Sequence, residues 1–262
     1  MIKIDNIEVF GWEAAIRGMR NPMNSWDKSD SFEFPPDEDG TPWIGPNDLK
    51  LMQSLVKAGT DHSKFMRMIN VTMDITAPMY WAKEMDTYKV GTVRNSCSTM
   101  HKIHSKEFTL DDFSHEHLIE NLYNVEGFLD VKEPLGVLQQ DIIPMLNFYR
   151  ERYLKTKDKK YWWQMIQLLP SSYNQKFTWQ ANYQVLRNIY FSRKNHKLDE
   201  WVEFCQIIET LPYAKELICL ELEEAYNNET LNYIDKDLNS TGKPLNATPC
   251  ITWCGANITN KK

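Results

Sequence analysis

Residues 69–75 form the clearest strand in the sequence, because apolar and polar side chains alternate along them. The apolar members are Ile69, Val71, Met73 and Ile75. Since successive side chains of a strand point to opposite faces, this pattern predicts a strand with one buried face. Pro78 follows, and it predicts that the strand ends there and that a helix containing Trp81, Ala82 and Met85 begins.

Helical spacing of apolar residues recurs in several other stretches. A helix after residue 46, capped by Asn47 or Asp48, is expected to stop at Gly59. Residues 176–194 have the best helical pattern, since Trp179, Tyr183, Leu186, Ile189 and Tyr190 follow the i, i+3, i+4 rule. Further helices are predicted over 137–156, over 197–210, and from Pro212 through Tyr226.

The remaining segments lack a periodic pattern. Residues 86–104 are expected to form a structured loop, and the charged run 155–160 a solvated linker. An apolar segment at 161–169 is closed by Pro170. Helices dominate and strands are few, so the fold class is α+β. We expect one domain over residues 1–226 and an irregular tail over 227–262.

Composition narrows the classes of function. The formal net charge of −6 argues against nucleic-acid binding as the main task, although a local basic pocket is compatible with it. No stretch approaches the roughly 20 apolar residues of a membrane helix, and no signal peptide is evident. Five scattered cysteines indicate free thiols in a reducing compartment, so a cytoplasmic location without membrane partners is expected.

Two groups of polar residues are candidates for a ligand site. Asn182 and Arg193 lie eleven residues apart, which returns to the same face of a helix. They either pair with neighbouring helices or point at a ligand. A Ser-rich stretch at 95–99 carries hydroxyl groups, and basic residues surround it, as in a phosphate site or an exposed basic loop. These basic residues are Lys89, Arg94, His101, Lys102 and His104.

Metal-binding patterns are weak. His115 and His117 would share a side only on a strand, and no third ligand accompanies them. Cys250 and Cys254 lack the CxxC spacing and have no partner pair. We therefore expect no metal site.

Several segments together resemble the flavin-dependent thymidylate synthases (the ThyX family). His62–Pro78 is similar to the segment that precedes the family's signature motif, and Leu51–Gly59 to the short helix before it. Leu169-Pro170 resembles the family's Leu-Pro. The helix that follows there has the pattern Asn-x3-Leu-x6-Arg, on which Asn182, Leu186 and Arg193 fall. The resemblance covers roughly residues 10–210.

The resemblance implies a fold, a reaction and an assembly. The family methylates dUMP to dTMP with FAD, NADPH and methylenetetrahydrofolate, in homotetramers whose active sites form at subunit interfaces. By this resemblance Arg193 would bind the pyrimidine. Asn182 would contact flavin, with His62 and Gln184 at further cofactor positions.

The signature motif itself departs from the family. Thr87-Tyr88-Lys89 replaces Arg-His-Arg. A Gln of the family is replaced by Glu84, whose negative charge would repel a phosphate. Ile166 and Gln184 stand where the family has arginines. Each lost charge-assisted contact to a phosphate is worth roughly 1.5–3 kcal/mol. We therefore expect weak or absent FAD binding, with NADPH and methylenetetrahydrofolate needed only by an active enzyme.

Three functions follow as hypotheses. The first is binding of a nucleotide-type ligand by a homo-oligomer, without the family's chemistry. The second is an active, divergent enzyme on a pyrimidine nucleotide, and the third is a structural protein with a vestigial pocket. We expect one pocket, with Arg193 facing its cavity; the alternative pairs Arg193 with an acid such as Asp199 or Glu203. The pocket residues would be Arg193, Asn182, Arg94, Ser96, Ser98, Lys89 and Tyr88.

Overall fold

The computed structural model describes residues 2–31, 43–122 and 131–221. The chain divides into two units, Met1–Leu220 and Glu221–Lys262. The predicted boundary at residue 226, the tail 227–262, and Cys250 and Cys254 lie outside the described residues, so these expectations stay predictions.

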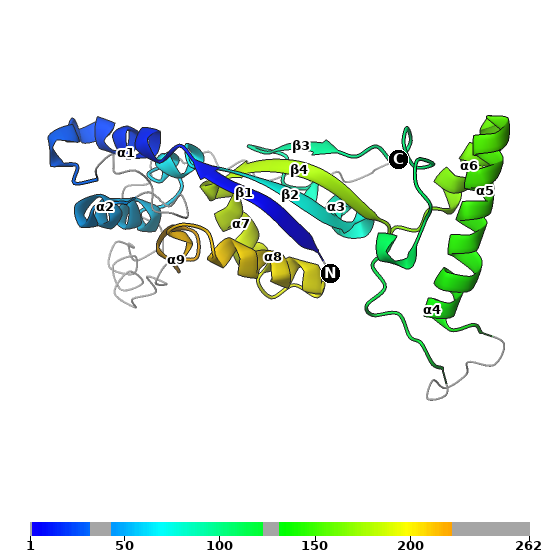
Figure 1. Cartoon of the computed structure of the whole chain (residues 1–262). Helices are drawn as coiled ribbons and strands as arrows, with labels where there is room; N and C mark the ends of the chain where they lie inside the picture. Colours follow the sequence, from blue (N-terminus) through cyan, green and yellow to red (C-terminus); the bar gives the residue numbers. More distant parts are fainter. Residues whose placement is uncertain (1, 32–42, 123–130, 222–262) are drawn as a thin grey trace, which may run out of the picture. The chain divides into compact units, whose positions relative to one another are not determined.

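A four-stranded antiparallel sheet lies at the centre of the first unit, with the strand order β1-β2-β4-β3 (Figure 1). The strands are β1 (Lys3–Phe10), β2 (Asn70–Pro78), β3 (Val93–Ser96) and β4 (Asn174–Asn182). Strand β2 confirms the predicted strand. Its apolar residues stand opposite those of β4, so that Met73 pairs with Trp179 and Ile75 with Phe177.

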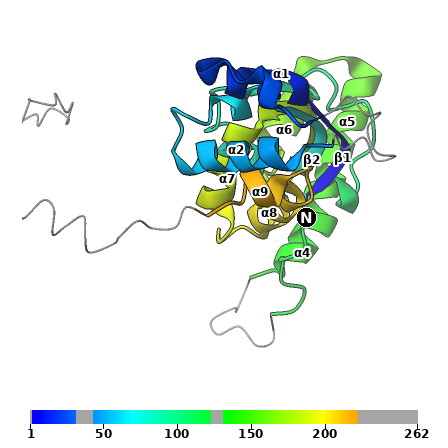
Figure 2. The same cartoon turned by 90° about the vertical axis from the view of Figure 1, so that its left-hand side faces the viewer.

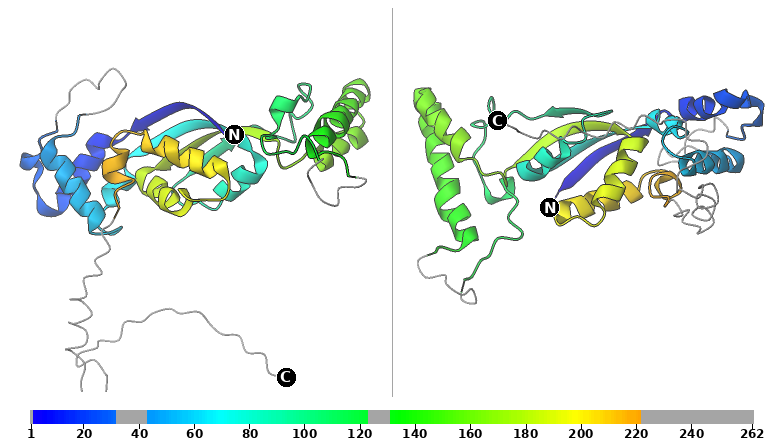
Figure 3. Two further views of the ribbon diagram at one scale, coloured as in Figure 1. Left: turned by 90° about the horizontal axis from the view of Figure 1, so that it is seen from below. Right: turned by 180° about the vertical axis from the view of Figure 1, so that it is seen from behind.

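Helices cover the apolar face of the sheet. They are α3 (Met79–Met85), α7 (Tyr183–Arg193) and α8 (Asp199–Glu209), and the last two lie along the sheet in Figures 1 and 3. Large aromatic rings fill the interface, with Trp81 and Trp201 at 4.7 Å between ring centroids and Trp179 and Phe204 at 6.0 Å. The opposite face of the sheet is polar, and Asp74 there accepts a hydrogen bond from Thr178.

The predicted helix over 176–194 is wrong in its first half, which is strand β4. Phe177, Trp179 and Ala181 are buried in alternation with exposed or half-buried residues, and the whole strand pairs with β2. Trp179 and Tyr183 are four residues apart, a spacing that fits both a helical face and alternate positions of a strand. Because residues 174–182 pair with β2, they form a strand, and the helix begins only at Tyr183.

The predicted loop over 86–104 contains strand β3, which adds an edge to β4. No buried hydrophobic residue lies on β3, so backbone pairing holds it and no apolar pattern marks it. Helix α2 (Pro46–Lys57) is capped by Gly45, and not by Asn47 or Asp48 as predicted. Gly59 follows the end of the helix with φ of +101°, which confirms the predicted stop.

A second apolar cluster is built by α5 (Ile143–Thr156) and α6 (Lys159–Leu168), which pack on each other. A turn, α4 (Pro134–Gly136), and a π-helical stretch at Val137–Ile142 lead into α5, in which Pro144 is the second residue. Helix α6 occupies the predicted apolar run, whereas the predicted linker 155–160 contains the end of α5, a two-residue turn and the start of α6. Leu146 and Met165 are fully buried between α5 and α6.

The remaining helices are short. Helix α1 (Trp12–Arg20) contacts the 3-10 turn Lys64–Arg67, and α2 contacts α9 (Ala214–Leu217; Figure 2). Helix α9 begins two residues after Pro212 and is a single turn, shorter than predicted. Other 3-10 turns lie at Asn21–Met23, Trp26–Lys28 and Leu110–Asp112. Within the described ranges, no helix has the length and apolar content needed to cross a bilayer.

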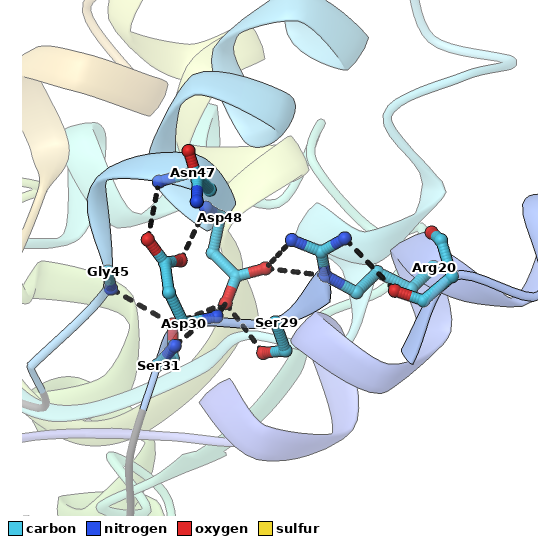
Figure 4. Close-up of polar contacts among 8 residues, drawn as sticks. Arg20, Ser29, Asp30, Ser31, Gly45, Asn47 and Asp48 are labelled. Carbon is cyan, nitrogen blue, oxygen red and sulfur yellow. Dashed lines mark hydrogen bonds and ion pairs between the residues drawn. The ribbon is translucent and has the colours of Figure 1, made fainter. Parts of the chain in front are cut away.

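A buried ion pair joins α1 to α2 (Figure 4). Asp48 is fully buried, and its Oδ1 accepts hydrogen bonds from Arg20 Nε at 2.7 Å and Nη2 at 2.6 Å. Its Oδ2 accepts from the hydroxyls of Ser29 and Ser31, both at 2.7 Å. Asp30 in turn accepts from the backbone N–H groups of residues 47 and 48. The network therefore fixes residues 29–31 against the start of α2.

Hydrogen bonding also sets the charge state of this carboxylate. Burial acts to raise the pKa of Asp48, but hydrogen bonds from Ser31, Ser29 and Arg20 outweigh it, and the pKa lies below its ordinary value. A carboxyl group whose pKa is lower in the folded state stabilises the fold above its unfolded pKa, about 3.9. That stabilisation is lost as the pH falls through the folded pKa.

We predict that Asp48→Asn lowers the free energy of unfolding by about 3–5 kcal/mol, because it leaves Arg20 charged, buried and unpaired. Urea denaturation at neutral pH measures the loss, and the difference from the parent should shrink as the pH falls below about 4. The matched control is Arg17→Gln, which breaks an exposed i, i+4 pair with Glu13 and should cost less than about 0.5 kcal/mol. Equal losses in both variants would contradict the assignment.

Candidate functional site

Asn182 lies at the junction between β4 and α7. It is the N-cap of α7, and its Oδ1 accepts a hydrogen bond from the backbone N–H of Val185 at 3.1 Å. Gly91 approaches it closely: with φ of +77°, a Cβ there would lie 3.0 Å from Asn182 Nδ2. Asn182 therefore begins the helix that ends at Arg193, and the two are not side by side on one helical face.

Gln184 and His62 lie near the same junction. Gln184 is buried, accepts a hydrogen bond from the Ser63 hydroxyl at 3.2 Å and donates one to Asn188 Oδ1 at 3.2 Å. His62 is exposed and directly precedes Ser63. The predicted cofactor residues thus lie near one junction of the fold, but the Gln184 amide is already hydrogen-bonded to Ser63 and Asn188.

Arg193, at the end of α7, forms an ion pair with Glu84 of α3. Its Nη1 lies 3.1 Å from Glu84 Oε2, and its Nε donates to the Tyr88 hydroxyl at 2.9 Å. Trp201 Nε1 also donates to Glu84 Oε2, at 2.9 Å, and the guanidinium stacks on the Trp201 ring at 4.8 Å. His196 Nε2 lies 2.8 Å from the same Nη1. We name these five residues the Arg193 cluster.

The Arg193 cluster shows what the guanidinium of Arg193 contacts. The guanidinium of Arg193 closes on a carboxylate, so the expectation that it faces a cavity is wrong. The carboxylate comes from Glu84 and not from Asp199 or Glu203, because α3 and α7 both pack on the sheet. The role of Arg193 in ligand binding stays a prediction, since a ligand would have to compete with Glu84.

Arg94 is also held by the protein itself. From β3, its Nη1 donates to Asp86 Oδ1 at 2.9 Å and its Nε to Ser96 Oγ at 2.8 Å. The guanidinium lies 4.6 Å from the centroid of the Phe177 ring. A cavity of about 160 Å³ brings Arg94 together with Tyr88 and Lys89. Three of the predicted ligand residues therefore line one small cavity.

A second cavity, of about 330 Å³, lies where the Ser-rich stretch meets the start of β4. We name it the lysine cavity, because Lys102, Lys106 and Lys176 line it. The cavity is also lined by four residues with hydroxyl groups, Thr76, Ser98, Thr99 and Ser105, and by two acids, Asp111 and Asp112. Arg94 Nη2 lies 3.5 Å from Oε1 of Gln175, which also lines the lysine cavity. Of the residues predicted to share one pocket, Tyr88, Lys89 and Arg94 line the first cavity and Ser98 lines the second. The linings of these two cavities do not include Arg193, Asn182 or Ser96.

Two polar groups in the lysine cavity lack a partner within the described part of the chain. Lys106 pairs with Asp112, and Lys176 lies 3.4 Å from Asp74, whereas Lys102 makes no ion pair. Asn174 Oδ1 is buried without a hydrogen bond, although its amide nitrogen donates to a backbone carbonyl at 3.4 Å. An unpaired buried acceptor is costly unless a ligand or water donates to it.

Sequence reasoning identified Ser98 and Lys102 but missed Lys106, Lys176 and Asn174. Lys176 was missed because residues 176–194 were predicted to be a helix, and Asn174 because it lies just before that segment. Both residues belong to β4. Glu84 was recognised only as a residue unfavourable to phosphate. Its pairing with Arg193 depends on tertiary contacts that no local pattern carries.

Metal and thiol chemistry find no support in the described residues. They contain no group of three His, Cys, Asp or Glu side chains placed to hold a metal ion. Cys97, Cys205 and Cys219 are free thiols, which agrees with the sequence-based expectation for these three. Burial raises the pKa of the Cys205 thiol to about 12, so this thiol stays protonated and unreactive at neutral pH.

Comparison with known proteins gives a clear structural match and no sequence match. No protein-family model and no curated protein matches the sequence. The structure is similar to the flavin-dependent thymidylate synthase ThyX from Helicobacter pylori complexed with FAD and dUMP. The TM-score is 0.57 at 15% identity, over 84% of this chain and 100% of that one. A second structure of ThyX from that organism, also with FAD and dUMP, gives 0.57 at 13% identity, over 83% and 97%.

The chain has the ThyX fold. This confirms the predicted α+β, ThyX-like architecture and the structural side of the resemblance. At this identity the likeness establishes the fold alone, so ligand and activity have to be argued from the site.

We predict that Arg193 and Glu84 stabilise each other, which a double-mutant cycle with Glu84→Gln and Arg193→Met measures. The coupling should be about 1 kcal/mol, modest because the Glu84 side chain is 40% exposed and screened by water. A matched control cycle pairs Lys132→Gln with Asp141→Asn, an exposed pair with contacts at 2.7 Å and 2.9 Å, which should couple more weakly. A coupling near zero in the first cycle would contradict the closed arrangement.

Proposed function

We propose that this protein binds a phosphate-bearing, nucleotide-type ligand in the lysine cavity, without thymidylate synthase chemistry. The observation that carries the proposal is the buried Asn174 Oδ1 acceptor, which has no hydrogen bond, in a cavity also lined by the exposed Lys102, which makes no ion pair within the described residues. A ligand that satisfies both needs an anionic oxygen and an N–H or O–H donor. Phosphate supplies the first, and a sugar hydroxyl or a base supplies the second.

The size and lining of the cavity agree with such a ligand. A volume of about 330 Å³ lies at the lower end of the range for small-molecule sites, about 300–1,000 Å³. The hydroxyls of Ser98 and Thr99 can donate to phosphate oxygens, whereas the Ser105 hydroxyl donates to the Lys102 carbonyl at 2.7 Å. The fold adds support, because the similar Helicobacter pylori protein is complexed with FAD and dUMP.

The residues at the flavin positions do not fit FAD. Gln184 is uncharged where the resemblance requires an arginine, and its amide is occupied by Ser63 and Asn188. The Asn182 oxygen caps α7. Thr87 and Tyr88 replace the cationic residues of the signature, and Tyr88 is hydrogen-bonded to Arg193. The proposed function therefore involves no flavin, and it needs neither NADPH nor methylenetetrahydrofolate.

Two other functions make different predictions. An active enzyme on a pyrimidine nucleotide is favoured by the fold alone, and it would purify with the visible absorbance of flavin. A structural protein with a vestigial pocket is favoured by the closed Arg193 cluster, and it would bind no nucleotide. Under the proposal, the purified protein is colourless and binds at least one nucleotide.

We predict that Lys102→Gln weakens nucleotide binding by roughly 10- to 150-fold, the equivalent of one charge-assisted contact of about 1.5–3 kcal/mol. Calorimetry with dUMP, other nucleoside monophosphates and inorganic phosphate measures the effect. Asn174→Ala should weaken the binding of nucleotides but not of inorganic phosphate. It removes the Oδ1 that would accept a hydrogen bond from the sugar or base of the nucleotide. The control is Lys57→Gln, an exposed lysine on α2. Absence of binding by the parent to every compound would refute the proposal.

We also expect the chain to form a homo-oligomer, following the tetramers of the resembled family. Large side chains favoured at interfaces are abundant, with nine Trp, twelve Tyr and twelve Met. Light scattering at micromolar concentration should give a mass of at least two chains. A monomer would contradict the expectation and any site shared between subunits.

A further inference from the structure

The turn between α5 and α6 is strongly basic, in contrast to the chain as a whole. Residues 150–160 contain six Lys or Arg and two Asp or Glu, whereas the whole chain carries a net charge of −6. The basic residues are Arg150, Arg152, Lys155, Lys157, Lys159 and Lys160. All except Arg150 are exposed. This concentration of positive charge therefore faces solvent.

Aromatic rings are interleaved with these lysines. Lys157 lies over the Tyr153 ring at 5.7 Å, and Lys159 lies 5.9 Å from the Trp162 ring and 5.7 Å from the Trp163 ring. Lys160 lies over Tyr161 at 4.9 Å. The Trp163 side chain is 43% exposed. We name these lysines and rings the α5–α6 cationic surface.

This surface is tied to the loop that lines the lysine cavity. Trp162 Nε1 donates to the Met100 carbonyl at 2.9 Å, and Arg150 Nε donates to the His104 carbonyl at 3.1 Å. The His104 ring packs edge-on against Tyr153 at 4.9 Å. Burial lowers the pKa of His104, and the charges of Lys157, Lys102 and Arg150 lower it further. Positive potential therefore extends from the cationic surface to Lys102.

We propose that the α5–α6 cationic surface binds a single-stranded polynucleotide. A strand repeats a phosphate and a flat base, and this surface repeats an ammonium group and an aromatic ring. Sequence-tolerant binding of single strands combines these two contacts, with lysines along the backbone and bases stacked on rings. A duplex offers the charge but keeps its bases stacked inside, so the rings would gain nothing from it.

The other anionic partner of basic surfaces is a lipid membrane. Membrane binding by an amphipathic element needs an apolar face that enters the acyl boundary. Here an ammonium group lies within 6 Å of each of the rings of Tyr153, Tyr161, Trp162 and Trp163, so charge and ring are mixed on one face. The observations favour the polynucleotide. The expectation that the chain does not bind nucleic acid rested on net charge, which averages over this local concentration.

The inference does not require the lysine cavity to bind a free nucleotide, although the two sites are adjacent. Binding of a labelled oligothymidylate, measured by fluorescence anisotropy as a function of salt concentration, tests it. For the full chain, log K should fall linearly with log salt concentration. In the triple variant Lys157→Gln, Lys159→Gln, Lys160→Gln the slope should decrease in magnitude by about 2, since each single-strand phosphate contact contributes about 0.7.

Two further variants separate the contributions. Trp163→Leu removes an exposed ring and keeps the charge, so it should weaken binding roughly fivefold or more with an unchanged salt slope. The matched control carries Lys50→Gln, Lys57→Gln and Lys215→Gln, three exposed lysines on α2 and α9, and should bind like the parent. Melting temperatures establish that each variant is folded.

The outcomes decide between the proposals. No binding at low salt, an equal loss in the control, or equal affinity for a duplex would overturn the inference. Tight binding to phosphatidylserine vesicles without binding to the oligothymidylate would assign the surface to a membrane and would overturn it too. Calorimetry of the triple variant with mononucleotides reports on the lysine cavity alone, so a failure there leaves the polynucleotide result standing.

Discussion

The pairing of β2 with β4 is the constraint on which the rest of the unit depends. The two strands match along nine residues each, and this register places the buried Val71, Met73 and Ile75 of β2 opposite the buried Ala181, Trp179 and Phe177 of β4. A shift of one residue would turn Trp179 and Phe177 towards the polar face. The same register places Asn182 opposite Asn70, where β4 ends and α7 begins. The position of the Arg193 cluster is therefore set by strand pairing.

Neutralisation of positive charge by nearby carboxylates is a common feature of this unit. Arg193 pairs with Glu84, Arg94 with Asp86, and Lys106 with Asp112. A guanidinium held by a carboxylate offers less to a ligand, because the ligand must first displace an internal anion. Lys102 and Lys89, which line the two cavities, make no ion pair within the described residues. The proposed site therefore rests on an unpaired lysine, and not on the arginines that stand out in the sequence.

Local patterns predicted the elements correctly where the apolar residues fitted only a strand or only a helix. They failed where the spacing fitted both. The alternation over 69–75 has no helical interpretation, and it became β2. In 176–194, Trp179 and Tyr183 satisfied both periods, and only the neighbouring strand β2 could decide. Strand β3 left no pattern because it is an edge strand held by backbone hydrogen bonds. Asp48 was expected to cap α2 locally, but its carboxylate is used by Arg20, a partner 28 residues away.

The site was less predictable than the fold for the same physical reason. Residue types indicated that Arg94, Lys89 and Tyr88 share a pocket, and they do line one cavity. They could not indicate which charges would be neutralised, because an ion pair such as Arg193 with Glu84 joins residues 109 positions apart. A fold can persist while such pairs change, since the buried pairing of Val71, Met73 and Ile75 with β4 does not depend on them. Retention of the ThyX fold at 15% identity is thus compatible with a site whose charges are arranged for a different ligand.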